Sequence, residues 1–237
     1  MERVCTLPDD FGCTPRRGLH VPADLRGLVV HCCCAPCAGA VFECLAAHDL
    51  HPLVFFFNPN IHPRSEYLRR RDELLALCRV LGFEVEVGDY EPRSWLEAVA
   101  GLEHEPERGA RCQVCFTYRL TATALLARER GATHFTSTLA TSRWKDRRQV
   151  DAAGAAAAQS TGGAVSYWDE DWRKGGLSER RSQLVRSCGF YNQHYCGCIY
   201  SLRSGGRDGT DRARRAAECS TPSGSTNTDA SLSAGIP

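Results

Sequence analysis

The sequence LVVHCCCAPC at positions 28–37 decides the fold. Its first four residues form a short apolar run that is typical of a buried strand, and a cysteine-rich turn follows directly. Adjacent cysteines on a regular strand cannot both point into one core, because successive side chains alternate between the two faces. A turn at the end of the strand can direct two thiolates toward one metal centre. The stretch therefore predicts a buried strand followed by a turn that carries chemistry.

Outward from this stretch, strand-like runs alternate with helix-like runs. Strands are predicted over 28–31, 52–57, 83–87, 133–138 and 164–168, and helices over 38–47, 67–81, 95–102, 112–130, 147–161 and 178–187. Ser65 is expected to cap the helix over 67–81. This alternation predicts an α/β fold with a mostly parallel sheet flanked by helices. Functional residues are expected where strands end and helices begin, at 31–37 and 139–146.

Composition sets the domain organisation. The chain has 237 residues, 43% of them hydrophobic, which is enough for a single domain with a proper core. We expect an N-terminal extension over 1–25, the domain over 26–204, and a disordered tail over 205–237 that is poor in large apolar residues. The net charge of +1 means that any nucleic-acid contact must come from local clusters. No apolar run is long enough for a membrane span, and no secretory signal is evident, so a cytoplasmic location is expected.

Fourteen cysteines are many for this length. A secreted disulfide scaffold would be shorter, with its cysteines spread through loops. Here they cluster, which favours metal or redox chemistry, and the clustered positions are Cys32, Cys33, Cys34, Cys37, Cys112, Cys115, Cys196 and Cys198. Five of the remaining six are read as terminal or small buried side chains, namely Cys5, Cys13, Cys44, Cys78 and Cys219.

Two pairs of thiolates, one from the turn at 32–37 and one from Cys112 and Cys115, would supply four sulfurs. The Cys-x-x-Cys spacing at the start of a helix directs both sulfurs to one point, where the helix N-terminus favours thiolates. Four thiolates suit tetrahedral zinc and an iron–sulfur cluster equally. Spacing alone therefore leaves open a structural zinc protein that binds RNA without redox chemistry.

The pair Cys196 and Cys198, separated by Gly197, is a further feature. Glycine relaxes the backbone enough for the two sulfurs to meet, and the resulting strained disulfide would be easily reduced. Such a pair suits a two-electron store. Two additional metal ligands, or a chance pair, would give the same spacing.

Six sequence blocks together resemble the cobalamin-independent epoxyqueuosine reductase family, QueH. They occur in order between about positions 29 and 204, and their combination is specific. The blocks are HCCCAPC (31–37), FFFNPNIHPRSEYLRR (55–70), RCQVCFTYRL (111–120), FTSTLATSRWKD (135–146), DWRKGG (171–176) and GFYNQHYCGCIYSL (189–202).

The resemblance implies a HUP-like, Rossmann-type domain that carries a [4Fe–4S] cluster. By motif, the cluster ligands would be Cys33, Cys34, Cys112 and Cys115, and a redox-active disulfide would join Cys196 and Cys198. Some members of the family are associated with a second, mononuclear iron. Candidate ligands for it are Cys37, one cysteine of the 196/198 pair and a carboxylate. Cys32 is a departure, since another residue type is common at that position.

The implied reaction is the reduction of epoxyqueuosine in tRNA to queuosine. Removing the epoxide oxygen takes two electrons and two protons, so a redox centre and an electron donor, still unidentified, are required. Candidate proton donors are Tyr195, Asp146 and Asp171, each of which also has an ordinary structural interpretation. Four nearby cations are candidates for contacts with tRNA phosphates, namely Arg143, Lys145, Arg173 and Lys174.

Two further classes of protein compete with this interpretation. An adenylating tRNA-modifying enzyme of the same fold would carry a Gly- and Ser-rich phosphate loop after its first strand, where this chain has HCCCAPC. A thioredoxin-like oxidoreductase would explain the spacing of Cys34 and Cys37. It would leave Cys112 and Cys115 unexplained.

Overall fold

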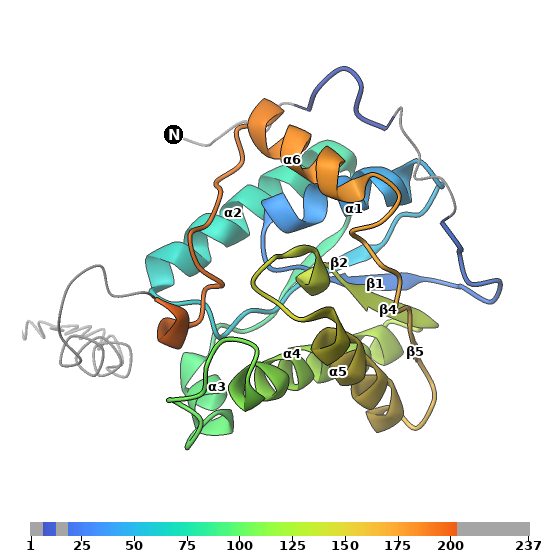
Figure 1. Ribbon diagram of the computed structural model, residues 1–237. Helices are drawn as coiled ribbons and strands as arrows, with labels where there is room; N and C mark the ends of the chain where they lie inside the picture. Colours follow the sequence, from blue (N-terminus) through green and yellow to red (C-terminus); the bar gives the residue numbers. More distant parts are fainter. Residues whose placement is uncertain (1–6, 13–18, 203–237) are drawn as a thin grey trace, which may run out of the picture. The chain divides into compact units, whose positions relative to one another are not determined.

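The computed structural model describes residues 7–12 and 19–202 (Figure 1). All of them belong to one unit, Met1–Arg203. The predicted tail over 205–237 lies outside the described residues. So do most of Met1–Gly18 in the predicted extension and the three cysteines at positions 5, 13 and 219.

Five parallel strands form the central sheet, which confirms the predicted α/β class. The strands are β1 (Leu28–His31), β2 (Leu53–Phe56), β3 (Val85–Val87), β4 (His134–Ser137) and β5 (Ser166–Tyr167), in the order β3-β2-β1-β4-β5. The chain winds outward from β1 to β3 and then returns to the other side of β1 to form β4 and β5. The strand order therefore reverses between β1 and β4, and that switch point is where ligands bind in open α/β sheets.

Helices cover both faces of the sheet. Figure 1 shows α1 (Ala35–Ala46), α2 (Arg64–Leu81) and α6 (Leu177–Ser187) on one face, and α4 (Ala110–Glu129) and α5 (Arg147–Ser160) on the other. The short α3 (Pro92–Ala98) packs against α4, and 3-10 turns occupy Leu139–Thr141 and Ile199–Ser201. No described helix combines the length and apolar character needed to cross a membrane.

The predicted cap of α2 is wrong. The helix begins at Arg64, with Pro63 at the N-cap position and no side-chain cap hydrogen bond. Ser65 therefore lies within the first turn, where its backbone is already helical and its hydroxyl cannot take the capping position.

Two hydrophobic clusters, one on each face of the sheet, form the core. Val30, Phe42 and Phe56 belong to the cluster on the α1 side, and Val29 and Phe135 to the cluster on the α4 side. Burying such a side chain stabilises the fold by roughly 1.5–3 kcal/mol. Cys44 and Cys78 lie in the first cluster, as expected for small buried side chains.

Candidate metal and redox site

The site begins at the carboxyl end of β1, where three strand ends are tied together. The imidazole of His31 is buried, with Nδ1 3.2 Å from Ser137 Oγ at the end of β4 and Nε2 3.1 Å from the carbonyl oxygen of Phe57, just after β2. Burial and the charge of Arg119 lower the pKa of His31 to about 3, so the ring is neutral. This histidine of the HCCC motif thus anchors the turn that follows it.

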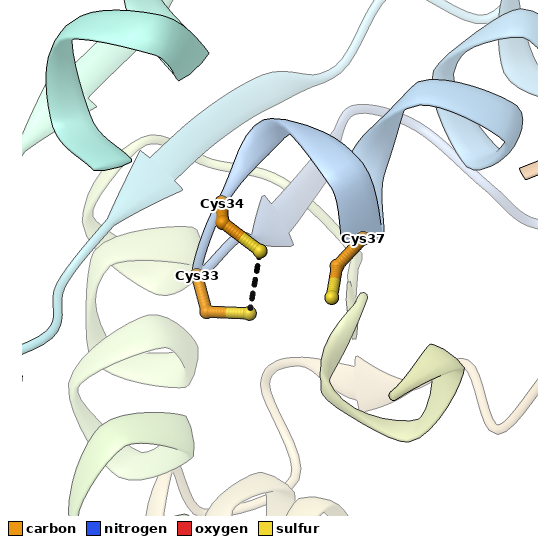
Figure 2. A group of neighbouring side chains, drawn as sticks. All are labelled: Cys33, Cys34 and Cys37. Carbon is orange, nitrogen blue, oxygen red and sulfur yellow. Dashed lines mark hydrogen bonds between the residues drawn. The ribbon is translucent and has the colours of Figure 1, made fainter. Parts of the chain in front are cut away.

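Three cysteines converge in that turn (Figure 2). The sulfur atoms of Cys33, Cys34 and Cys37 all lie within 4.8 Å of one another, and those of Cys33 and Cys34 are 3.6 Å apart. Cys34 occupies the N-cap position of α1, and Cys37 lies in its first turn. Three buried thiols with mutually close sulfurs form a group that could hold a metal.

Cys32 faces the other way. It packs in the hydrophobic cluster on the α1 side, whereas Cys33, Cys34 and Cys37 belong to the cluster on the α4 side. Burial, together with nearby Cys78, holds the pKa of the Cys32 thiol well above its usual range. The cysteine that departs from the family pattern is therefore a core thiol.

The other two predicted ligands lie in the first two turns of α4. Cys112 and Cys115 line a pocket together with Cys196 and Cys198. The four predicted ligands thus divide between this pocket and the turn after β1. Sequence reasoning expected the helix N-terminus to favour a thiolate at Cys112, but burial outweighs that effect and raises the pKa of the Cys112 thiol.

Lys145 connects the two groups of thiols. Its side chain is buried, with 6% relative exposure, and lines the same pocket. Burial alone would lower its pKa, but the charges of Cys33, Cys37 and Cys196 outweigh this and raise it. Lys145 is therefore a cation held among thiols, and it is too buried for the phosphate contact that the sequence suggested.

The charge of the turn is concentrated on one sulfur. Hydrogen bonds with Cys34 and Cys37 hold the pKa of the Cys33 thiol well below its usual range, and the charges of Lys145 and Arg119 act in the same direction. The hydrogen bond with Cys33 raises the pKa of Cys34 in return. The group is therefore built to hold a thiolate, the form of cysteine that binds metals.

The Cys196–Cys198 loop is shaped by Gly197, whose φ of +104° few other residues adopt. A Cβ atom there would also lie 2.9 Å from Ile61 Cγ1 and 3.0 Å from Arg70 Nη1, so the position requires glycine. Both cysteines are present as thiols. The hydrogen bond with Cys198 holds the pKa of Cys196 well below its usual range, with Lys145 contributing.

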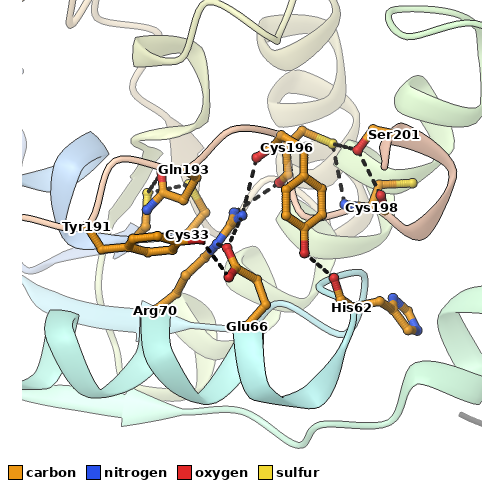
Figure 3. Close-up of polar contacts among 11 residues, drawn as sticks. Cys33, His62, Glu66, Arg70, Tyr191, Gln193, Cys196, Cys198 and Ser201 are labelled. Atoms are coloured by element: carbon orange, nitrogen blue, oxygen red, sulfur yellow. Dashed lines mark hydrogen bonds and ion pairs between the residues drawn. The ribbon is translucent and has the colours of Figure 1, made fainter. Parts of the chain in front are cut away.

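A buried arginine on α2 holds this loop in place (Figure 3). Arg70, 2% exposed, donates from Nη1 to the carbonyl oxygen of Cys196 and from Nη2 to that of Tyr195, both at 3.2 Å. Its Nε donates to Glu66 Oε1 at 2.7 Å, and the hydroxyl of Tyr191 donates to Glu66 Oε2 at 3.0 Å. Sequence reasoning missed the pair of Arg70 and Glu66. Its signal was the placement of Arg70 on the buried stripe of α2.

The proton donors suggested by the sequence all have structural roles. The hydroxyl of Tyr195 donates to the carbonyl oxygen of His62. Asp146 is the N-cap of α5 and accepts from the backbone N–H groups of residues 148 and 149. Asp171 pairs with Arg147, their side-chain atoms lying 3.4 Å apart. Among the titratable groups that line the pocket, Lys145 interacts electrostatically with Cys33, Cys37 and Cys196.

Several buried polar atoms at the pocket have no partner. Arg111 Nε and Arg119 Nε are buried donors without a partner within the described part of the chain, and both side chains line the pocket. Arg119 also donates to Asn58 Oδ1, and Asn58 Nδ2 donates to the carbonyl oxygen of Cys32 at 2.8 Å. Buried thiols beside unpaired donors suit an anionic metal–sulfur centre, so the donor set fits such a group.

Comparison with known proteins assigns the chain to a family. The family described as epoxyqueuosine reductase QueH matches residues 28–204. The chain belongs to the QueH family. It is 43% identical over 188 residues to the epoxyqueuosine reductase QueH of Histophilus somni, covering 79% of this chain and 77% of the relative.

Other QueH proteins are also similar over most of the chain. The chain is 42% identical over 188 residues to QueH of Haemophilus influenzae, covering 79% and 76% of the two chains. It is 34% identical over 179 residues to QueH of Thermotoga maritima, covering 74% of this chain and 90% of the relative. The region matched to the QueH family contains both groups of thiols, Lys145 and Arg70.

Proposed function

We propose that this chain is an epoxyqueuosine reductase, which removes the epoxide oxygen of epoxyqueuosine in tRNA and leaves queuosine. The observation that carries the proposal is the position of buried Lys145 between two sets of cysteines, one in the turn after β1 and one in the pocket. Both sets lie at the switch point of a QueH-family sheet. We place this activity in the cytoplasm, as expected for an enzyme of tRNA modification.

The reaction balances with the proposed redox pair. Opening the epoxide to an alkene consumes two electrons and two protons and releases water. With Cys196 as the thiolate and Cys198 as the thiol, formation of their disulfide supplies both electrons and the proton of Cys198, and the ammonium of Lys145 supplies the second proton. The backbone N–H of Cys198 donates to Cys196 Sγ at 3.5 Å, and this proximity of the two residues supports the role.

Cys196 and Lys145 have separate roles in the proposed reaction. Cys196 carries the thiolate, since Cys198 donates to it and Ser201 Oγ lies 3.0 Å from its sulfur. Lys145 is placed to hold a proton near the departing oxygen, because it is a buried lysine of the pocket and an ammonium can give up a proton that a guanidinium keeps. Burial of the thiols excludes water from the reacting atoms, which strengthens these electrostatic interactions.

The ligands we propose for a [4Fe–4S] cluster are Cys33, Cys34, Cys112 and Cys115. When bound, such a cluster supplies low-potential electrons one at a time. Cys37, beside Cys33 and Cys34, is the candidate thiol for a second, mononuclear iron in the same region. The buried thiols, the adjacent cations and the unpaired polar atoms support a metal centre here.

The competing functions lack a matching observation. A structural zinc site would need four thiolates that close around the ion, and it would give the Cys196–Cys198 pair no role. An adenylating enzyme would need backbone N–H groups free to cradle phosphate after β1. Here that turn holds three thiols together.

The test uses protein prepared without oxygen and under iron-replete conditions. Iron and sulfide content and the visible spectrum are measured first. The reduced protein is then incubated with tRNA that contains epoxyqueuosine, with a chemical reductant and without ATP or cobalamin. Mass spectrometry of the digested tRNA should show the loss of one oxygen atom. Iron-loaded protein that never produces this change would rule out the proposed function.

A further inference from the structure

A second, polar hollow lies beside the thiol site. This groove, of about 340 Å³, is lined by Arg143 and Trp144 before α5, by Arg173, by Arg181 on α6, and by Gln193 in the segment that leads to the Cys196–Cys198 loop. Cys37 also lines it, so the groove runs directly up to the thiols of the turn after β1.

The groove is cationic and rich in donors. Three arginines line it, and no carboxylate does. Asp171 Oδ1 approaches Arg173 at 3.8 Å, but this aspartate also pairs with Arg147, so its charge is shared. Arg181 Nε and Gln193 Nε2 are both buried and lack a hydrogen-bond partner among the described residues. Unused donors and excess positive charge suit an oxyanion as the ligand of this groove.

Trp144 connects this groove with the thiol pocket, because its side chain lines both. The guanidinium of Arg143 lies over its ring, 4.7 Å from the centroid. An aromatic ring beside arginines is a common platform for a nucleic-acid base whose phosphate is held alongside. Gln193 provides a second connection, because its Oε1 accepts from Cys34 Sγ at 3.5 Å.

We propose that this groove binds the phosphodiester backbone of the tRNA strand next to the modified nucleoside, with Arg143, Arg173 and Arg181 as its contacts. The proposal rests on the proposed function, which places a nucleotide of tRNA at the thiols. The phosphate would be fixed in the groove while the adjoining nucleoside passes Trp144 toward Cys196 and Lys145. An acidic protein that delivers electrons is the other partner with suitable charge. The concave groove and the shared tryptophan favour RNA.

The experiment measures binding of an unmodified anticodon stem-loop RNA by fluorescence anisotropy at several salt concentrations, with iron-loaded protein. Arg143→Gln and Arg181→Gln are compared with Arg128→Gln, which changes an exposed arginine near the opposite end of α4 from Cys112. Each groove variant should weaken binding. Each should also make the slope of log K against log salt shallower by about 0.7, the value for one contact to single-stranded nucleic acid. Arg128→Gln should leave the affinity and the slope unchanged.

Steady-state turnover provides the second measurement. The double variant Arg143→Gln/Arg181→Gln should raise KM for tRNA and retain kcat, with iron content and visible spectrum matching the parent. Unchanged RNA affinity and unchanged KM in the double variant would overturn the groove proposal, and an acidic protein would then be the partner to test. Arginine-dependent RNA binding without any loss of oxygen would leave the groove standing and would refute the reductase function instead.

Discussion

Cys32 and Cys33 are adjacent in the sequence, yet their side chains enter opposite layers of the molecule. The alternation of β1 continues for one residue beyond the strand, since the backbone N–H of Cys32 still donates to the carbonyl oxygen of Phe55. The turn then brings Cys33 and Cys34 to the same side, next to Cys37. Chemically identical side chains therefore acquire different roles from backbone geometry alone.

This difference predicts contrasting phenotypes for cysteine variants. Cys33→Ser or Cys34→Ser should lose most of the iron and the visible absorbance, because each removes a proposed ligand. Cys32→Ala should keep the iron and the spectrum and lower the free energy of unfolding by about 1 kcal/mol, typical of a small core truncation. Iron analysis and chemical denaturation make the comparison. Loss of iron in Cys32→Ala alone would reverse the assignment.

The proposed redox pair has its own test. Cys196→Ser and Cys198→Ser should abolish oxygen removal from tRNA while most of the cluster absorbance and the fold remain. Cys188→Ser, at the C-cap of α6, is the matched control and should turn over normally. If either pair variant strips the iron, the changed cysteine is a metal ligand. Normal turnover in both pair variants would show that the electrons reach the substrate by another route.

Variants of Asp146 can show whether its carboxylate has a structural or a catalytic role. It accepts from two backbone N–H groups at the start of α5, at 2.8 and 3.2 Å. Asp146→Asn should retain both the cap and the turnover. Asp146→Ala should lower the free energy of unfolding by about 1 kcal/mol, because those N–H groups lose their acceptor. A collapse of kcat in the folded Asn variant would show that the carboxylate takes part in proton transfer.

At the scale of elements, α2 and the segment from Tyr191 to Cys198 act as one unit. The pairing of Arg70 with Glu66 joins the helix to three positions of that segment. A further contact is the bridge between Ile61 and Cys198, just before the helix. The loop that carries the proposed redox pair is therefore held by a helix and not only by its own short sequence.

Breaking this pair should loosen the loop. Arg70→Met leaves Glu66 buried without its cation and should lower the free energy of unfolding by about 3–5 kcal/mol. It should also speed alkylation of Cys196, a readout that simple destabilisation at a distance would not change below the unfolding transition. Arg71→Met is the control. It removes a more exposed pair with Asp72 and should cost no more than about 1 kcal/mol. Equal effects of the two variants would argue against the role of Arg70 in holding the loop in place.

The strands and helices were predictable because their hydrophobic patterns are local. The strand at 28–31 could be predicted from its apolar run and α5 from its high alanine content. Local patterns could not show that the cysteines of the turn after β1, the cysteines of the pocket and Lys145 lie near one another. Their placement depends on the order of strands in the sheet. Lys145 illustrates the limit, since it lies in a mostly polar stretch between β4 and α5 and its side chain is nevertheless buried.

At the scale of the whole molecule, the N-terminal segment contributes to the domain. Leu7 and Phe11 pack against the core cluster on the α1 side. Asp10 pairs with Arg180 at 2.8 Å, and Arg180 also binds buried Glu43. The backbone N–H of Gly12 donates to Glu43 Oε1 at 2.9 Å. These contacts connect the predicted extension to α1 and α6.

Truncation tests the predicted boundaries. A chain of residues 26–204 should fold, hold iron and keep most activity. Its melting temperature should fall below that of residues 1–204, because the contacts of Leu7, Asp10 and Phe11 are lost. Thermal unfolding followed by circular dichroism, with iron analysis, makes the comparison. If removing residues 205–237 alone abolishes iron binding, the tail belongs to the site and the boundary is misplaced.

The separation of the cysteines along the chain has a consequence for biogenesis. The turn after β1, the start of α4 and the Cys196–Cys198 loop are far apart in sequence and meet only once the sheet is assembled. The loop is the last of the three to be synthesised, and its hydrogen bond with Arg70 can form only then. We expect iron to be delivered to a nearly folded apoprotein before this loop has bound Arg70. Maturation in the cell would then depend on how quickly the loop binds Arg70.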